Sequence, residues 1–147
     1  MLLDSNLLVL FLVGNGSPSR VGHQRRLKQY DLDDLTRLND IVEYFQRHVS
    51  LPNVLTEASN LIGSGKQEIA PGAASALATY CREIHEIYAD SSNVVDLPQY
   101  QQLGLTDSAV LWISSNKITV LTDDHDLYGH VNGRGCKAIN LYHSKKL

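Results

Sequence analysis

Residues 118–127 read ITVLTDDHDL and set the pattern on which the predicted fold rests. The β-branched and apolar half of this stretch, Ile118 to Thr122, predicts a buried strand. Asp124 stands where the N-cap of a helix is expected, so a short helix should run from Asp124 to Val131. A buried strand that passes through acidic residues into a helix is typical of α/β folds, whose ligands bind at the carboxyl ends of the strands.

The rest of the chain repeats this alternation of strand and helix signals. The other predicted strands are Leu2–Leu3, His48–Leu51, Asn93–Asp96 and Cys136–Tyr142. The other predicted helices run from Ser5 or Asn6 to Val13 and over Leu32–Arg47, Pro52–Ile62, Gly72–Tyr88 and Leu105–Ser115. Strands separated by helices need crossover connections, which predicts a mainly parallel sheet of about five strands with helices on both faces.

The composition excludes several other classes of protein. The chain has 147 residues, 43% of them hydrophobic, and 13 basic against 16 acidic side chains give a formal net charge of −3. This balance predicts one compact domain over residues 1–147, and neither a disordered chain nor a protein held on nucleic acid by bulk charge. The two cysteines, Cys81 and Cys136, form no CxxC pair, which suits a reducing cytoplasm. The longest apolar run, Leu7–Val13, is too short to cross a membrane and predicts a buried helix.

Acidic residues recur at the predicted strand ends. Asp4 follows the first strand, Glu57 lies in the helix after the second, Asp107 opens the helix after the third, and Asp124 follows the fourth. Because the carboxyl ends of parallel strands share one edge of a sheet, these carboxylates are expected to converge. Taken singly, Asp107 and Asp124 are better explained as helix-cap or first-turn residues. Four acids from distant segments together indicate a shared site.

Helical spacing places two of these acids beside an apolar stripe. Glu57 follows Val54 by three residues, and Asp107 precedes Leu111 by four, so both are expected on the core side of their helices. A buried charge is costly unless something compensates it, and no Lys or Arg lies one helical turn from either residue. The expected compensation is a divalent cation, and carboxylate oxygens suit Mg²⁺ or Mn²⁺.

Four segments of the chain resemble the PIN domain, and within it the VapC-like toxins of bacteria. They read LLDSNLL at residues 2–8, NVLTEASNL at 53–61, GLTDSAV at 104–110 and VLTDDHDL at 120–127. Their order and strand context cover essentially the whole chain. The resemblance implies a three-layer α/β/α sandwich whose strands lie in the order 3-2-1-4-5.

The resemblance also implies an activity, a set of site residues and partners. Proteins of this family are metal-dependent endoribonucleases, so the chain is expected to cleave RNA with one or two Mg²⁺ or Mn²⁺ ions and to leave 5′-phosphate and 3′-hydroxyl ends. Similar toxins are cytoplasmic homodimers held inactive by an antitoxin protein, which is the expected partner. The implied site consists of the catalytic metal ligands Asp4, Glu57, Asp107 and Asp124, an accessory acid at Asp126, and supporting polar residues at Asn6 and Thr122.

Two points stay open in the sequence. Asp123 and Asp124 are adjacent, and the spacing after Thr122 favours Asp124 as the residue that faces the metal. A polar insert, Asn15–Gln29, either contacts RNA phosphates or forms a solvated, mobile loop. Its candidate RNA-binding residues are Arg20, Arg25, Arg26 and Lys28.

Two other classes of protein share part of this pattern. A receiver-like signalling domain also gathers acids around Mg²⁺, but it expects an adjacent acidic pair near the first strand, where only Asp4 stands. A non-catalytic PIN-like scaffold usually lacks one or more of the acids, and this chain has all four. The ribonuclease is therefore the favoured prediction, with the scaffold as its alternative.

Overall fold

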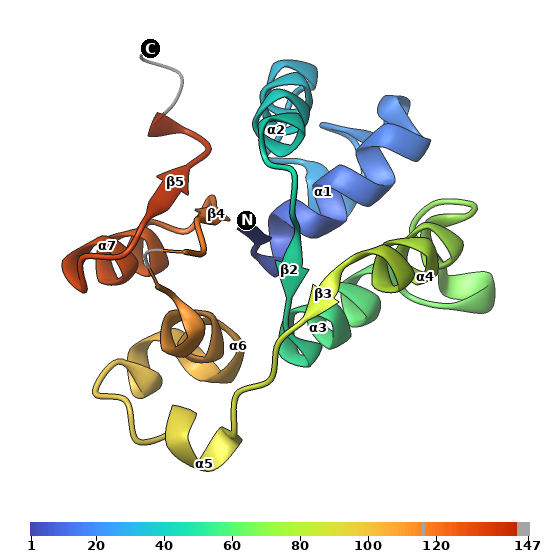
Figure 1. The fold of residues 1–147 in the computed structure, drawn as a ribbon. Coiled ribbons are helices and arrows are strands. Elements are labelled where there is room, and N and C mark those ends of the chain that lie inside the picture. Colours follow the sequence, from blue (N-terminus) through green and yellow to red (C-terminus); the bar gives the residue numbers. More distant parts are fainter. Residues whose placement is uncertain (116, 144–147) are drawn as a thin grey trace.

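The structure of the protein is a computed structural model that describes residues 1–115 and 117–143. Figure 1 shows its helices and strands. The strands are β1 (Leu2–Leu3), β2 (Val49–Ser50), β3 (His85–Glu86), β4 (Val120–Thr122) and β5 (Ala138–Asn140). The α-helices are α1 (Ser5–Gly16), α2 (Leu32–Tyr44), α3 (Pro52–Ile62), α4 (Ala73–Glu83), α5 (Ser91–Val94), α6 (Tyr100–Ile113) and α7 (His125–Gly133). Short 3₁₀ helices are η1 (Pro18–Arg20), η2 (Arg25–Leu27) and η3 (Gly65–Gln67).

The strands form two small parallel sheets. One has the order β1-β4-β5, with Leu2 opposite Val120, and the other pairs β2 with β3. The sheets meet at Met1, whose amino group donates to the Arg47 carbonyl oxygen at 2.6 Å and whose carbonyl oxygen accepts from the Val49 amide at 2.9 Å. The predicted α/β class is confirmed. A continuous five-stranded sheet is not present among the described residues, because the ladder is interrupted between β2 and β1.

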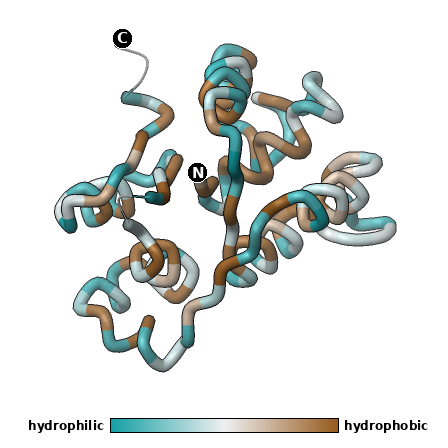
Figure 2. Tube along the Cα trace, in the orientation of Figure 1, coloured by the Kyte–Doolittle hydropathy of each residue, from teal (hydrophilic) through white to brown (hydrophobic). Residues whose placement is uncertain are grey.

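Helix α1 lies at the centre of the packing. It contacts α2, α3 and α4, whereas α6 and α7 pack on each other and α7 covers β4 and β5 (Figure 1). Figure 2 shows hydrophobic residues along most of α1, and the apolar run Leu7–Val13 is largely buried, as predicted. Gly14 lets α2 approach closely, since a Cβ there would lie 2.9 Å from Leu35 Cδ1. No helix in the described ranges has the length and apolar character needed to span a membrane.

The predicted strand at Asn93–Asp96 is wrong. The chain forms the short helix α5 there, and the Asp90 carbonyl oxygen accepts hydrogen bonds from the amides of Asn93 and Val94. The two adjacent valines that suggested a strand divide between core and solvent, because Val94 is buried and Val95 is exposed. Local hydrogen bonding to Asp90 therefore prevailed over the β propensity of two residues.

The third strand lies instead inside the predicted helix Gly72–Tyr88. Helix α4 ends at Glu83, and Ile84 takes an extended conformation with φ −84° and ψ 156°. The polar residues of β3 carry no strand signal, and their pairing with β2 is a long-range contact. Tyr88, which helical spacing had turned toward the core, is 74% exposed.

Gly104 divides α6 and gives the first testable prediction. Its φ of 76° and ψ of −179° break the helix, which leaves Asp107 in the first turn of the second half. This backbone conformation is essentially restricted to glycine, so Gly104→Ala should lower the free energy of unfolding by about 1–3 kcal/mol. The cause is backbone strain alone, because no atom lies within 4 Å of the added Cβ.

Urea unfolding measures this loss, and Gly129→Ala in α7 is the matched control. Gly129 also has no neighbour within 4 Å of an added Cβ, but its φ is not positive. Alanine is the better helix former, so this control should leave stability unchanged or raise it by up to ~1 kcal/mol. Equal losses in the two variants would contradict strain at Gly104.

Candidate functional site

Asp4 is a buried carboxylate at the junction of β1 and α1. Its Oδ1 accepts a hydrogen bond from the Leu7 amide at 2.9 Å, and its Oδ2 accepts from the Thr122 hydroxyl and from the Asp123 amide at 3.2 Å. Burial and then the charge of Asp123 raise the pKa of Asp4 well above its ordinary value, and Asp107 adds to this effect. The hydrogen bonds from Thr122 and Leu7 lower the pKa in part. Asp4 is therefore fixed in place with unfavourable charges around it.

Thr122 links Asp4 to the second strand-to-helix junction of the site. Its hydroxyl is buried, donates to Asp4 and accepts a hydrogen bond from the Asp124 amide at 2.9 Å. Asp124 in turn caps α7, since its Oδ1 accepts from the Leu127 amide at 2.8 Å. The expected helix cap at Asp124 is thus present, and one Asp124 oxygen has no protein donor within the described residues.

Asp107 brings the third segment into the site. Burial raises the pKa of Asp107 to about 7, and the charges of Asp124, Glu57 and Asp123 raise it further in that order of effect. These carboxylates are therefore electrostatic neighbours, as the positions of the strand ends predicted. Within the described chain, none of them forms an ion pair with Lys or Arg. The negative charge of the cluster is uncompensated.

The side chains do not form a ready-made metal centre. No three His, Cys, Asp or Glu side chains in the described residues are arranged to hold a metal ion as they stand. The expectation that Glu57 faces the core is wrong, because Glu57 is exposed, as is Asp124. The helix α3 stripe is narrower than its spacing suggested, with Val54 and Ala58 buried beside it. Two of the four carboxylates can therefore change rotamer in solvent, while Asp4 cannot.

Asp123 and Tyr30 are parts of the site that sequence reasoning left open or missed. The Tyr30 hydroxyl donates to Asp123 Oδ2 at 2.5 Å, and burial followed by the Asp123 charge raises the pKa of Tyr30. Asp123 is thus turned toward the insert by Tyr30, and its amide binds Asp4. No sequence pattern marks this contact, because 93 residues separate its two partners.

The remaining predicted site residues lie apart from these contacts. Asn6 and Asp126 are exposed, and within the described residues no hydrogen bond joins either one to the carboxylates. The insert is a packed segment and not a solvated loop, since Val21 and Leu27 are buried. Its four basic residues differ in role: Arg20 donates to the Ile69 carbonyl oxygen at 2.9 Å, whereas the exposed ones are Arg25, Arg26 and Lys28.

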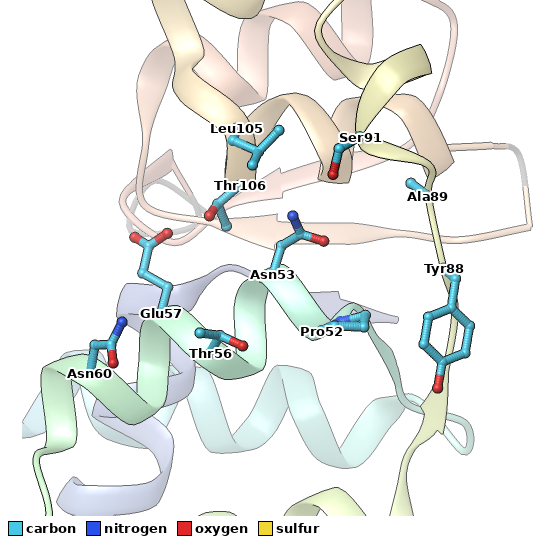
Figure 3. A pocket seen from close by; sticks show the side chains of 10 residues that line it. All are labelled: Pro52, Asn53, Thr56, Glu57, Asn60, Tyr88, Ala89, Ser91, Leu105 and Thr106. Atoms are coloured by element: carbon cyan, nitrogen blue, oxygen red, sulfur yellow. The ribbon is translucent and has the colours of Figure 1, made fainter.

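A groove of about 530 Å³ adjoins the carboxylates between α3, α6 and the segment that follows β3. Figure 3 shows Glu57 at one end of this groove, Tyr88 at the other, and Asn53 between them. Thr106 also lines it, one residue before Asp107. The groove is therefore continuous with the cluster through Glu57 and Thr106.

Comparison with protein-family models, with curated proteins and with solved structures gives no match for this chain. The relation to the PIN domain therefore rests on the resemblance of four short segments. The carboxylate cluster is the feature from which a function has to be inferred.

Replacement of Thr122 tests the hydrogen bonds that hold Asp4. Thr122→Val removes the donor to Asp4 and the acceptor for the Asp124 amide, and should lower the free energy of unfolding by about 2–3 kcal/mol. Thr122→Ser keeps the hydroxyl and loses one buried methyl group, worth about 1 kcal/mol. Chemical denaturation of both variants measures the difference. Equal losses would show that the hydroxyl contributes nothing to stability.

Replacement of Asp107 tests the repulsion within the cluster. Its folded pKa lies above its unfolded one, so stability contributed by its protonated form is lost as the pH rises from about 4 to about 7. At about pH 8 in chelator, Asp107→Asn should therefore raise Tm by roughly 3–8 °C, equivalent to roughly 1–2 kcal/mol. The gain should shrink at about pH 5, where wild type is protonated.

Thermal melts with a chelator present measure this effect. Asp96→Asn is the control, because Asp96 is exposed and outside the cluster. A lower Tm for Asp107→Asn at the higher pH would mean that Asp107 acts only as a first-turn helix residue.

Proposed function

We propose that this protein is a magnesium- or manganese-dependent endoribonuclease. The observation that carries the proposal is the raised pKa of Asp4 and Asp107, caused by burial and by the neighbouring carboxylates Asp123, Asp124 and Glu57. A protein that keeps acids this close together without a Lys or Arg partner destabilises itself unless a cation balances the charge. Hard carboxylate oxygens select Mg²⁺ or Mn²⁺ as that cation.

The donor chemistry fits one or two such ions. Asp4, Glu57, Asp107 and Asp124 would hold them, with Asp123 as a further acid and Asp126 as an accessory one. When bound, Mg²⁺ or Mn²⁺ supplies an activated water and stabilises the leaving oxygen of a phosphodiester. Asp4 gives the site a fixed oxygen because its carboxylate is buried and hydrogen-bonded. The exposed side chains of Glu57 and Asp124 can rotate toward it.

Three finer parts of the proposal are supported by the resemblance to VapC-like toxins. They are a PIN-like sandwich, in which the contacts of Met1 would continue the sheet from β1 to β2, a homodimeric assembly, and an antitoxin that blocks the acidic site. The exposed residues Arg25, Arg26 and Lys28 lie on the insert that Tyr30 ties to Asp123, and they are the proposed phosphate contacts.

A non-catalytic scaffold that acts through protein contacts is the second candidate. The observation in its favour is that no three acidic, His or Cys side chains of the described chain are arranged to hold a metal ion as they stand. This alternative predicts a folded protein that cleaves no RNA with any metal.

Cleavage of a mixed pool of structured RNA tests the two candidates. The wild-type chain should cut the RNA with Mg²⁺ or Mn²⁺ and not with chelator, and should leave 5′-phosphate ends. Asp4→Asn should abolish cutting, because the amide is neutral, while it preserves the helix cap of α1, since Asn caps as well as Asp. Electrophoresis of the products and 5′-end ligation provide the readouts.

Asp96→Asn serves as the control in the same assay. This exposed acid is outside the cluster, so the variant should cut RNA like wild type. Absence of cutting by well-folded wild type under every metal would overturn the nuclease and favour the scaffold.

A further inference from the structure

The groove beside the carboxylates has a composition that its neighbours do not share. At one end it carries Tyr88, an aromatic side chain that is 74% exposed. The Tyr88 hydroxyl donates to the Glu86 carboxylate, whose hydrogen bond and charge raise the pKa of Tyr88. That bond holds one edge of the ring and leaves its faces available. An exposed aromatic ring beside an acidic site is a surface on which a flat ligand can stack.

The wall of the groove supplies hydrogen-bonding groups without fixed partners. The side-chain amides of Asn53 and Asn60 line it, and neither hydrogen-bonds to another described residue. The exposed amides of Asn15 and Asn39, by contrast, bond to each other at 2.9 and 2.8 Å. Side-chain amides present both donors and acceptors, the combination that the edges of nucleobases match.

The groove is poor in positive charge. Among the described residues that line it, Glu57 is the one with a charge, and none is Lys or Arg. Phosphates therefore find no cation in the groove, and a ligand there would be held by stacking and neutral hydrogen bonds. Bases offer those contacts only when they are unstacked and unpaired, as in single strands and loops.

We propose that this groove binds an unpaired base of the RNA substrate next to the phosphodiester that is cleaved, with Tyr88 as the stacking surface and the amides of Asn53 and Asn60 at the edge of the base. The proposal rests on the proposed nuclease function, and it assigns single-stranded RNA as the substrate class. The groove is continuous with the carboxylates through Glu57 and Thr106, so a base in it belongs to a nucleotide near the cluster.

Binding and cleavage assays with Tyr88 variants test this assignment. The binding probe is a labelled single-stranded RNA pool, compared with the same RNA as a duplex, in the presence of Mg²⁺ and with Asp4→Asn in every protein to prevent cleavage. Tyr88→Ala should weaken single-strand binding by roughly 5- to 100-fold, the loss expected for one stacked base. Tyr88→Phe should retain most of the affinity, because the ring is kept. The dependence of affinity on salt should be the same with and without the ring, since no phosphate contact changes.

Tyr44→Ala is the matched control, because Tyr44 is 82% exposed and lies on α2, outside the groove. This variant should bind and cleave like its parent. In proteins that retain Asp4, Tyr88→Ala should lower kcat/KM for single-stranded RNA by a similar factor. Its melting temperature should stay unchanged, which separates a binding role from a folding role.

The outcomes distinguish the groove from the nuclease. Metal-dependent cleavage that Tyr88→Ala leaves unchanged would overturn the groove proposal and leave the nuclease standing. Single-strand binding that depends on Tyr88, from a chain that cleaves nothing with any metal, would support the groove and overturn the nuclease. Equal affinity for duplex and single strand, or no RNA binding at all, would overturn the groove assignment.

Discussion

The carboxylate of Asp4 accepts hydrogen bonds from the amide of Leu7, the hydroxyl of Thr122 and the amide of Asp123. These donors come from helix α1, from strand β4 and from the turn after β4, so one side chain ties together the two strand-to-helix junctions of the larger sheet. The hydrogen bonds replace the hydration that Asp4 loses on burial and keep its position fixed. Every other part of the candidate site is defined by its place relative to this carboxylate.

The same residue also makes the site unfavourable in the absence of a counter-charge. Asp4, Asp107 and their acidic neighbours raise one another's affinity for protons, and α6 places Asp107 there through the backbone break at Gly104. Fold stability and site chemistry are thus opposed at this edge of the sheet. Such opposition is typical of sites whose electrostatics are arranged for a ligand and not for the empty protein.

The sequence predicted the parts of the fold that local patterns control. The apolar run of α1, the stripes of α2 and α3, and the alternation into β4 all appear close to their predicted positions. Strand β3 was missed because its residues are polar and pair only through a distant contact, and α5 was missed because backbone bonds to Asp90 overrode two valines. Hydrophobic periodicity says nothing about such tertiary effects.

The site was predictable to the same degree. Strand-end reasoning brought Asp4, Asp107 and Asp124 together, because their positions follow from chain direction in a parallel sheet. The contact between Tyr30 and Asp123 and the exposure of Tyr88 depend on how distant segments meet. Glu57 was assigned to the core by spacing alone, yet the groove at its side leaves it in solvent.

Strand β1 has consequences for how the chain reaches its folded state. Leu2 pairs with Val120, and Asp4 bonds to a residue 118 positions later, so the earliest residues made are paired with some of the last. Contacts of such sequence separation form slowly, because a long loop must close first. On the ribosome, α1 must wait as an unshielded apolar helix until β4 has emerged, which makes the nascent chain a natural client of chaperones. An unfinished chain also lacks the carboxylates that follow β4, so no fragment released early contains the complete acidic cluster.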